Sequence, residues 1–399
     1  MEAIFLDWLN LMLRWTHIIV AVAWIGSSFY FMWLDSHLEA PAEPSDEIEG
    51  QLWMVHSGGF YQVNKIMVAP KVMPRTLHWF KWEAAWTGIT GIGLLAVVFY
   101  LGSEAFLIDP QVSKITKLQA VGIGAGTLVV GWLLYDAMYM SNWGNENGAL
   151  STAIAFAGLC GVAFGLSQVL SGRGAYVHVG ALMGIVMVLN VWIRIIPGQQ
   201  NLVDARKAGE EPDPSYGMRA KQRSVHNNYM TLPIVFIMIS SHYPETYGHA
   251  QNWAVLIALF IIGALVRHWF NLRNSGSSAI WPVPVAIVAM ASLAAWISGP
   301  QVAAKIAAAK APPVPFEKIE TLVKTRCSSC HTAKPVQEGF ETPPKNIKFD
   351  TPEDIHKHAA MIKRTAVLTS TMPLGNITKM TPEERRLLGL WIDQGMKLD

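Results

Sequence analysis

Cysteine is scarce in this chain, which has 399 residues and only three cysteines, Cys160, Cys327 and Cys330. Three thiols are too few to build a disulfide framework, so other interactions must hold the fold together. Charged residues make up 15% of the sequence, whereas soluble globular domains have about 25%. The formal net charge of +2 gives no reason to expect a nucleic-acid partner. The low charge content instead indicates a membrane protein.

Apolar and aromatic residues are correspondingly abundant, with 51% hydrophobic residues and 16 tryptophans. Tryptophan collects where the hydrocarbon of a bilayer meets its headgroups, so this count fits the same class of protein. The first residues include Glu2 and Asp7, and they lack a basic segment and a small-residue cleavage site. We therefore expect the first apolar run to be a retained membrane anchor and not a removable signal peptide.

Apolar runs long enough to cross a membrane recur through the first three quarters of the sequence. Crossing about 30 Å of hydrocarbon takes about 20 helical residues, and on that basis we predict an all-α bundle of about eight transmembrane helices. The predicted helix cores are 9–34, 82–101, 118–140, 150–170, 176–196, 227–242, 253–272 and 280–298. The sixth is the weakest, because it is short and contains Pro233.

The last hundred residues change character and predict two further regions. Residues 299–315 are rich in Ala and Pro, a composition typical of an extended, semi-rigid linker. Residues 316–399 have the polarity of a small soluble domain, and residues 1–298 form the transmembrane domain. Thr381 and Glu384 have the spacing of a capping box, which predicts the start of a final helix.

The segment Cys327-Ser328-Ser329-Cys330-His331 has the spacing of a haem c attachment site. In such a site the two thiols form thioethers with the haem vinyl groups and the adjacent imidazole ligates the iron. A thioredoxin-like redox pair or half of a zinc site would use the same cysteines. The sequence contains no second cysteine pair and no strand pattern near this one. We therefore predict a covalently bound haem c, held by Cys327, Cys330 and His331.

The second iron ligand is predicted to be Met372, which precedes Pro373 on a stretch without periodicity. A thioether ligand would raise the reduction potential, as it does in electron-transfer cytochromes. The Met-Pro pair resembles that of class I cytochromes c, so residues 316–399 are expected to form a small domain of that type. The competing methionines, each of which can also be core filler, are Met361, Met380 and Met396. His356 and His358 are expected to be solvated.

The distribution of basic residues predicts the orientation in the membrane. If the N-terminus is outside, the outer loops hold only Lys114, Lys117 and Arg173. The inner loops then hold Lys65, Lys71, Arg75, Lys81, Arg206, Lys207, Arg219, Lys221, Arg223 and Arg273. An even number of crossings also places the C-terminal domain outside, where bacteria attach haem c. We therefore expect a multi-pass protein of the bacterial inner membrane, with its N-terminus and cytochrome domain in the periplasm.

Ionisable residues inside predicted spans are costly, so each is a candidate functional residue. In this topology His17, His178 and His242 lie towards the periplasm. They could ligate a haem b, or they could simply be hydrogen-bonded within the bundle. The residues towards the cytoplasm are Asp136, Arg194, Arg267, His268 and the run His226-Asn227-Asn228-Tyr229. Snorkelling to the interface is the alternative explanation for the two arginines.

Several segments together resemble the bacterial membrane-bound urate oxidases (urate hydroxylases), in which a multi-span domain is fused to a C-terminal cytochrome c. The likeness covers nearly the whole chain, and its membrane segments are more specific than the haem motif. These membrane segments are Arg14-Trp15-Thr16-His17, Ala23-Trp24-Ile25-Gly26, Asn142-Trp143-Gly144, His226-Asn227-Asn228-Tyr229-Met230-Thr231-Leu232-Pro233 and Ser241-His242-Tyr243-Pro244.

The resemblance implies oxidation of urate to 5-hydroxyisourate with water as the oxygen source. The two electrons would leave through haem c to a downstream cytochrome c or terminal oxidase. Urate is a monoanion near neutral pH and needs a cation and hydrogen-bonding groups. The residues of those types are Arg194, Arg267, His226, Asn227 and Asn228, and the family motif does not say which of them touch urate. The alternative function is a quinol-facing, membrane-anchored cytochrome c that relays electrons without urate chemistry.

Overall fold

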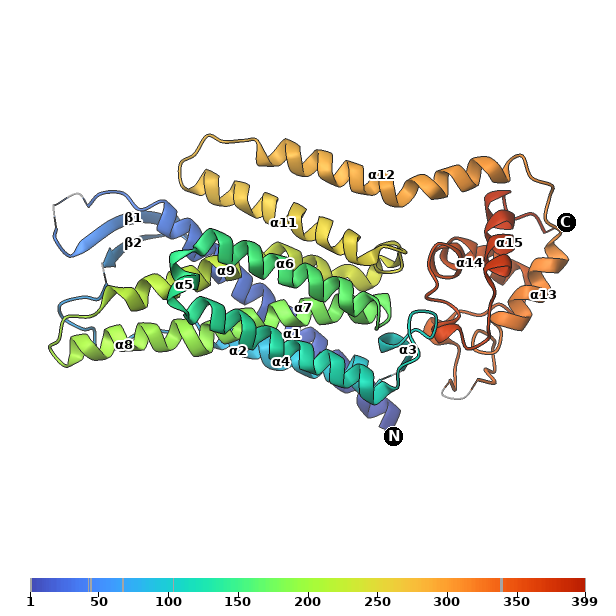
Figure 1. Ribbon diagram of the computed structural model, residues 1–399, viewed down its shortest axis with the longest axis horizontal. Helices are drawn as coiled ribbons and strands as arrows, with labels where there is room; N and C mark the ends of the chain where they lie inside the picture. The colour runs from blue at the N-terminus through green and yellow to red at the C-terminus, as the bar shows by residue number, and fades with distance from the viewer. Residues whose placement is uncertain are drawn as a thin grey trace.

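The computed structural model of the protein describes residues 2–41, 43, 45–66, 68–102, 104–337 and 340–398. Helices dominate it, and within these residues seven are long and apolar enough to cross a membrane (Figure 1). They are α1 (Glu2–Ser36), α2 with η1 (Trp82–Leu95 and Ala96–Tyr100), α4 (Lys117–Met140), α6 (Gly148–Ser167), α7 with η2 and α8 (Gly172–Leu189, Asn190–Ile195 and Ile196–Lys207), α11 (Asn252–Asn274) and α12 (Pro282–Ala308). The architecture is compatible with a multi-pass membrane protein.

The predicted sixth span differs from the observed helix. Helix α9 (Pro214–Ile239) begins earlier than predicted, and it is not among the seven apolar helices because its first half carries Arg219, Lys221 and Arg223. It nevertheless runs antiparallel to α7 and η2, since Ile237 lies against Gly180 of α7 whereas Arg223 bonds to Asn190 of η2. Eight long helical segments thus lie side by side, and the polar half of α9 is placed among neighbours that can pair with it.

Pro233 lies inside α9 without ending it. Proline removes one backbone donor and crowds the preceding turn, so its neighbours must leave room for it. Gly263 of α11 supplies that room, because a Cβ atom there would lie 3.2 Å from Cδ of Pro233. The close approach of α9 and α11 therefore depends on a glycine opposite the proline.

A two-stranded antiparallel hairpin interrupts the otherwise helical chain and departs from the all-α prediction. Its strands are β1 (Ile48–His56) and β2 (Gly59–Ile66). Ser57 and Gly58 form the turn with φ of +50° and +78°, and positive φ at both central residues is what a two-residue hairpin turn of type I′ requires. Figure 1 shows the hairpin at the end of the bundle that lies away from the C-terminal unit.

The predicted linker is largely helical, which corrects the expectation of an extended segment. Helix α12 continues to Ala308 through Pro300, so only residues 309–315 form a non-helical tether. The reason is composition, because alanine has the highest helix propensity. The alanines concerned are Ala303, Ala304, Ala307 and Ala308.

Residues from Phe316 onwards form a separate small helical unit. Its helices are α13 (Phe316–Arg326), α14 (Pro352–Ile362) and α15 (Pro382–Asp393). The capping box of Thr381 and Glu384 is confirmed at the start of α15. Buried apolar side chains from all three helices, with Trp391 only 1% exposed, form one core.

This C-terminal unit packs against one end of the bundle, the end at which α1 also begins (Figure 1). Arg364 forms an ion pair with Glu245 at 3.3 Å and donates to the backbone oxygen of His242 at 2.9 Å. The backbones also approach closely, since a Cβ atom on Gly248 would lie 2.5 Å from Cβ of Thr369. The unit is therefore held against the bundle by direct contacts as well as by the tether.

Candidate functional site

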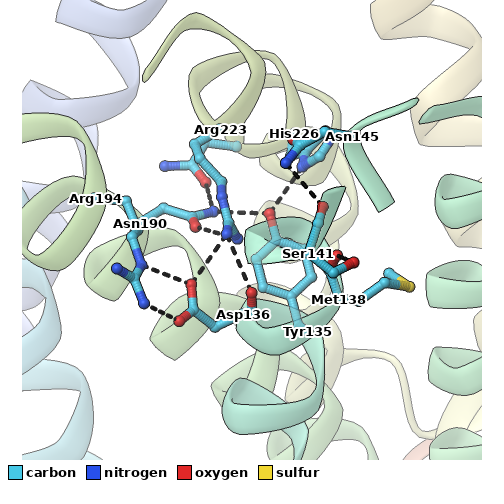
Figure 2. Close-up of polar contacts among 10 residues, drawn as sticks. Tyr135, Asp136, Met138, Ser141, Asn145, Asn190, Arg194, Arg223 and His226 are labelled. Carbon is cyan, nitrogen blue, oxygen red and sulfur yellow. Dashed lines mark hydrogen bonds and ion pairs between the residues drawn. The ribbon is translucent and has the colours of Figure 1, made fainter. Parts of the chain in front are cut away.

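Asp136 of α4 is the centre of a buried ionic group formed with η2 and α9 (Figure 2). One of its oxygens, Oδ1, accepts hydrogen bonds from Arg194 Nε at 2.8 Å and from Arg223 Nη2 at 3.0 Å. Arg194 Nη2 contacts the other oxygen, Oδ2. The Arg223 side chain is only 3% exposed. One carboxylate thus serves two guanidinium groups, and the group keeps an excess of one positive charge.

The local backbone explains how Arg194 and Asn190 reach this group. Between α7 and α8 the helix widens into the π-helical segment η2, which contains both residues. Such widened turns occur frequently at functional sites, because they turn side chains away from the regular helical pattern. The predicted span 176–196 contains no residue that signals this widening, so it could not be predicted.

A chain of polar contacts leads from Arg223 into the bundle (Figure 2). Arg223 Nη1 donates to Asn190 Oδ1 at 3.3 Å, and Asn190 Nδ2 donates to the Tyr135 hydroxyl at 3.1 Å. The Tyr135 hydroxyl is in turn hydrogen-bonded to His226 Nδ1 at 2.8 Å. The Arg223 guanidinium also lies over the rings of Tyr135 and Tyr139, at 4.9 and 5.3 Å from their centroids. These contacts fix Arg223 and His226 in place.

A cavity of about 140 Å³ adjoins this ionic group, between α4, η2, α8 and α9. Its polar lining comes from Arg194, Asn201, Tyr216, Arg219 and Arg223. A cavity of about 10–15 Å³ already accommodates one water molecule, so this cavity has room for a small organic ligand. Its position beside uncompensated positive charge makes it the candidate binding site.

Arg267 and Asn228, two of the residues predicted for urate, belong to a second polar group between α9 and α11. Arg267 Nε and Asn271 Nδ2 both donate to Asn228 Oδ1, at 2.8 and 3.0 Å. Arg267 lies over the ring of Phe29, 3.9 Å from its centroid. Among the described residues, the buried atoms Arg267 Nη2, Asn228 Nδ2 and Asn271 Oδ1 have no hydrogen-bond partner.

The five residues predicted for urate are thus divided between two places. Arg194, His226 and Asn227 lie around Asp136, and Asn227 accepts from Asn190 at 2.9 Å. Arg267 and Asn228 lie elsewhere. The division follows from helix geometry, because successive residues on a helix point about 100° apart. Asn227 and Asn228 therefore face different neighbours.

Sequence reasoning missed four residues of these groups: Tyr135, Asn190, Arg223 and Asn271. From the sequence, Arg223 was considered only as one of the basic loop residues that predict the orientation in the membrane. A usable signal existed for it, because Arg223 precedes His226 by three positions and Asn227 by four. Residues at those spacings share one face of a helix. Asn190 precedes Arg194 by four positions and Asn271 follows Arg267 by four, so the same spacing was available for them, whereas Tyr135 carried no such signal.

The histidines predicted to ligate haem b have different neighbours. His178 donates from Nδ1 to the Gly174 carbonyl at 2.7 Å, and its Nε2 is hydrogen-bonded to the Tyr100 hydroxyl at 2.9 Å. Both ring nitrogens of His178 therefore form hydrogen bonds, which agrees with the alternative interpretation that this histidine is hydrogen-bonded within the bundle. His17 bonds through Nδ1 to Thr90 at 3.0 Å, and His242 is exposed at the end of η3 (Ser240–His242), beside the C-terminal unit. A haem b held by these histidines stays a prediction.

The haem motif lies at the end of α13 in the C-terminal unit. His331 Nδ1 donates to the Ile347 carbonyl at 2.9 Å, which leaves Nε2 as the nitrogen available for a metal. Burial raises the pKa of the Cys327 thiol to about 12. A reactive redox cysteine has a lowered pKa, which is the opposite direction. Met372 packs against the same apolar core as Cys327. Two thiols, an oriented imidazole and a nearby thioether together fit haem c.

The competing methionines and histidines differ in their burial. Met380 is 2% exposed and belongs to the core. His356 is exposed, as expected, whereas His358 is half-buried, with its ring centroid 6.1 Å from that of Phe349. In the part of the chain that the structure describes, no three His, Cys, Asp or Glu side chains form a group that could hold a metal ion. A haem iron needs no such group, because the protein supplies it with one imidazole and one thioether.

Comparisons with known proteins identify the bundle. A search of curated proteins and a search of solved structures each found no match. The model of a protein family described as Urate oxidase N-terminal matches residues 3–298, which is the bundle without the C-terminal unit. The chain therefore belongs to the urate oxidase N-terminal family, which supports an oxidoreductase that acts on urate.

Proposed function

We propose that the protein oxidises urate to 5-hydroxyisourate with water as the oxygen source. The observation that carries this proposal is the family match over residues 3–298 in a chain that continues into a haem c motif. Urate and one water molecule yield 5-hydroxyisourate, two protons and two electrons. The reaction therefore needs an electron acceptor, and the same chain offers a place for one.

The acceptor in this proposal is a haem c bound to Cys327, Cys330, His331 and Met372 in a class I-like cytochrome c domain. When bound, haem c supplies a one-electron acceptor whose potential depends on its axial ligands. The protein orients those ligands. The Ile347 carbonyl fixes the His331 ring, and Arg385 Nη1 holds the Met372 loop by donating to the Met372 carbonyl at 2.5 Å.

The length of the bundle places a condition on the electron path. The cavity lies at the Met140 end of α4, whereas the C-terminal unit packs beyond the Lys117 end (Figure 1). The 24 residues of α4 rise about 1.5 Å each, or roughly 36 Å in total. A site in this cavity therefore requires an intervening redox group, most simply a haem b, for which His17, His178 and His242 are the candidate ligands. A downstream cytochrome c or terminal oxidase would take the electrons onwards.

Anaerobic addition of urate to the purified, oxidised holoprotein tests the function. We expect the α band of haem c to appear without any mediator, and the same concentration of xanthine to leave the spectrum unchanged. Dithionite added at the end checks that the haem was reducible. If urate has no effect and a quinol reduces the haem, the protein is an electron relay and the proposal is wrong.

The proposed location is the bacterial inner membrane, with the N-terminus and the cytochrome domain in the periplasm. Reporter fusions after Lys71 and Lys221 should then report the cytoplasm, because the basic loops remain inside. Fusions after Lys114 and at the C-terminus should report the periplasm. The reverse pattern in both pairs would contradict this orientation.

A further inference from the structure

We propose that the cavity between α4, η2, α8 and α9 binds urate as its monoanion, with Arg219 as a substrate-binding residue at the cavity surface. This inference rests on the proposed function and gives it a location. Arg194 and Arg223 form the charged wall of the same cavity. Nothing in the family match distinguishes these residues, so the assignment comes from the geometry alone.

The charge of the cavity matches a monoanion. Three guanidinium groups line it, and none of its lining residues, all of which the structure describes, has a carboxylate. Asp136, behind the wall, pairs with Arg194 and Arg223. Asp213 lies near Arg219, and its pKa is lowered by hydrogen bonds from Ser215 and by the charge of Arg219. Three cations against these two carboxylates leave one positive charge for a ligand to neutralise.

The lining also suits a flat heterocycle with many polar edges. Tyr216 contributes an aromatic ring, and the Arg219 guanidinium lies 5.2 Å from its centroid. Guanidinium groups are planar, donate several hydrogen bonds in fixed directions and stack on aromatic faces. Asn201 adds an amide that can both donate and accept. Urate presents carbonyl oxygens and ring N–H groups around its edge, which these side chains can satisfy together.

Arg219 is the residue to test, because the other two arginines also hold the bundle together. Arg223 is buried, and Arg194 shares its carboxylate, so replacing either would unbalance the ionic group. Arg219 is exposed, and its hydrogen bonds go to Ser215 one turn earlier in the same helix. Its replacement should leave the fold intact. Arg273 provides the matched control, since it is an exposed arginine near the end of α11 that does not line the cavity.

Equilibrium dialysis of labelled urate against the full-length holoprotein measures binding without turnover, if the haem is reduced beforehand. We expect Arg219→Gln to raise the dissociation constant on the order of tenfold or more, as the loss of a hydrogen bond to a charged group does. The dissociation constant of Arg219→Lys should lie between those of the wild type and Arg219→Gln, because lysine keeps the charge but lacks the planar guanidinium group. Arg273→Gln should bind urate as the wild type does, and haem content and melting temperature should be unchanged in all variants.

Two results would overturn the assignment. Equal urate affinity in Arg219→Gln and wild type would exclude Arg219, and displacement of urate by an equal concentration of inorganic phosphate would show a general anion site. If either occurs while urate still reduces the oxidised haem, the proposed function stands and only the location is wrong. If the wild type neither binds urate nor is reduced by it, both proposals are wrong.

Discussion

Replacing both Cys327 and Cys330 with alanine is expected to remove all covalently bound haem from the protein. The two thiols are the only groups in the C-terminal sequence that can form thioethers. The measurement is haem-dependent peroxidase staining of the denatured protein in a gel. Each single variant should stain weakly, because one thioether is the most it can form. Full staining of the double variant would refute the haem c assignment.

Met372→Ala is the matched comparison for this experiment, since it leaves both thiols and His331 in place. Its covalent haem staining should equal that of the wild type, while the reduction potential falls because the axial thioether is lost. The Met372 side chain is partly buried against the core, so a melting curve should accompany the titration. An unchanged potential in a folded variant would mean that another residue ligates the iron.

Asp136→Ala is expected to destabilise the bundle by about 3–5 kcal/mol, the usual cost of removing one partner from a buried ion pair. The reason is the Arg223 side chain, which is 3% exposed and would lose its carboxylate partner. Thermal unfolding in detergent, followed by circular dichroism, measures the effect. The melting temperature of Asp136→Asn should lie between those of the wild type and Asp136→Ala, because asparagine keeps the shape and one hydrogen-bond acceptor of the side chain without its charge.

Glu211→Ala serves as the control for Asp136. Glu211 also pairs with an arginine, Arg206, but its side chain is 85% exposed. Exposed pairs contribute about 0–1 kcal/mol, so this variant should melt close to the wild type. If Asp136→Ala also melts like the wild type, the ionic group does not hold α4, η2 and α9 together, and our description of the site fails.

Hydropathy predicted the seven long apolar helices, because a membrane span needs an unbroken apolar run. It located α9 poorly, because the cations of α9 are compensated by residues far away in the sequence. Asp136 is 58 residues from Arg194 and 87 residues from Arg223. Pairings over such distances leave no local pattern. The same reason explains why residue types indicated Arg194 and His226 but gave neither their partners nor the cavity.

The structure differs from the prediction at the β1–β2 hairpin and at the predicted linker, and both differences have local causes. The hairpin depends on two turn residues with positive φ, Ser57 and Gly58, and their signal was obscured by the polar surroundings of a predicted loop. The linker prediction took the joint richness of residues 299–315 in Ala and Pro as typical of an extended segment, and did not weigh the helix propensity of the alanines. Helix α12 contains Pro300 and continues. Composition alone therefore misjudged a segment in which one strong breaker is outnumbered by helix-forming residues.

Helix α12 leaves only residues 309–315 between the bundle and its C-terminal unit. A tether this short keeps its two ends at a high effective concentration, and the contact of Arg364 with Glu245 fixes their mutual orientation. The bundle and the C-terminal unit therefore keep the same relative position at any concentration of the protein. Competition with freely diffusing carriers is restricted to the outer side of the C-terminal unit, where electrons would leave the molecule.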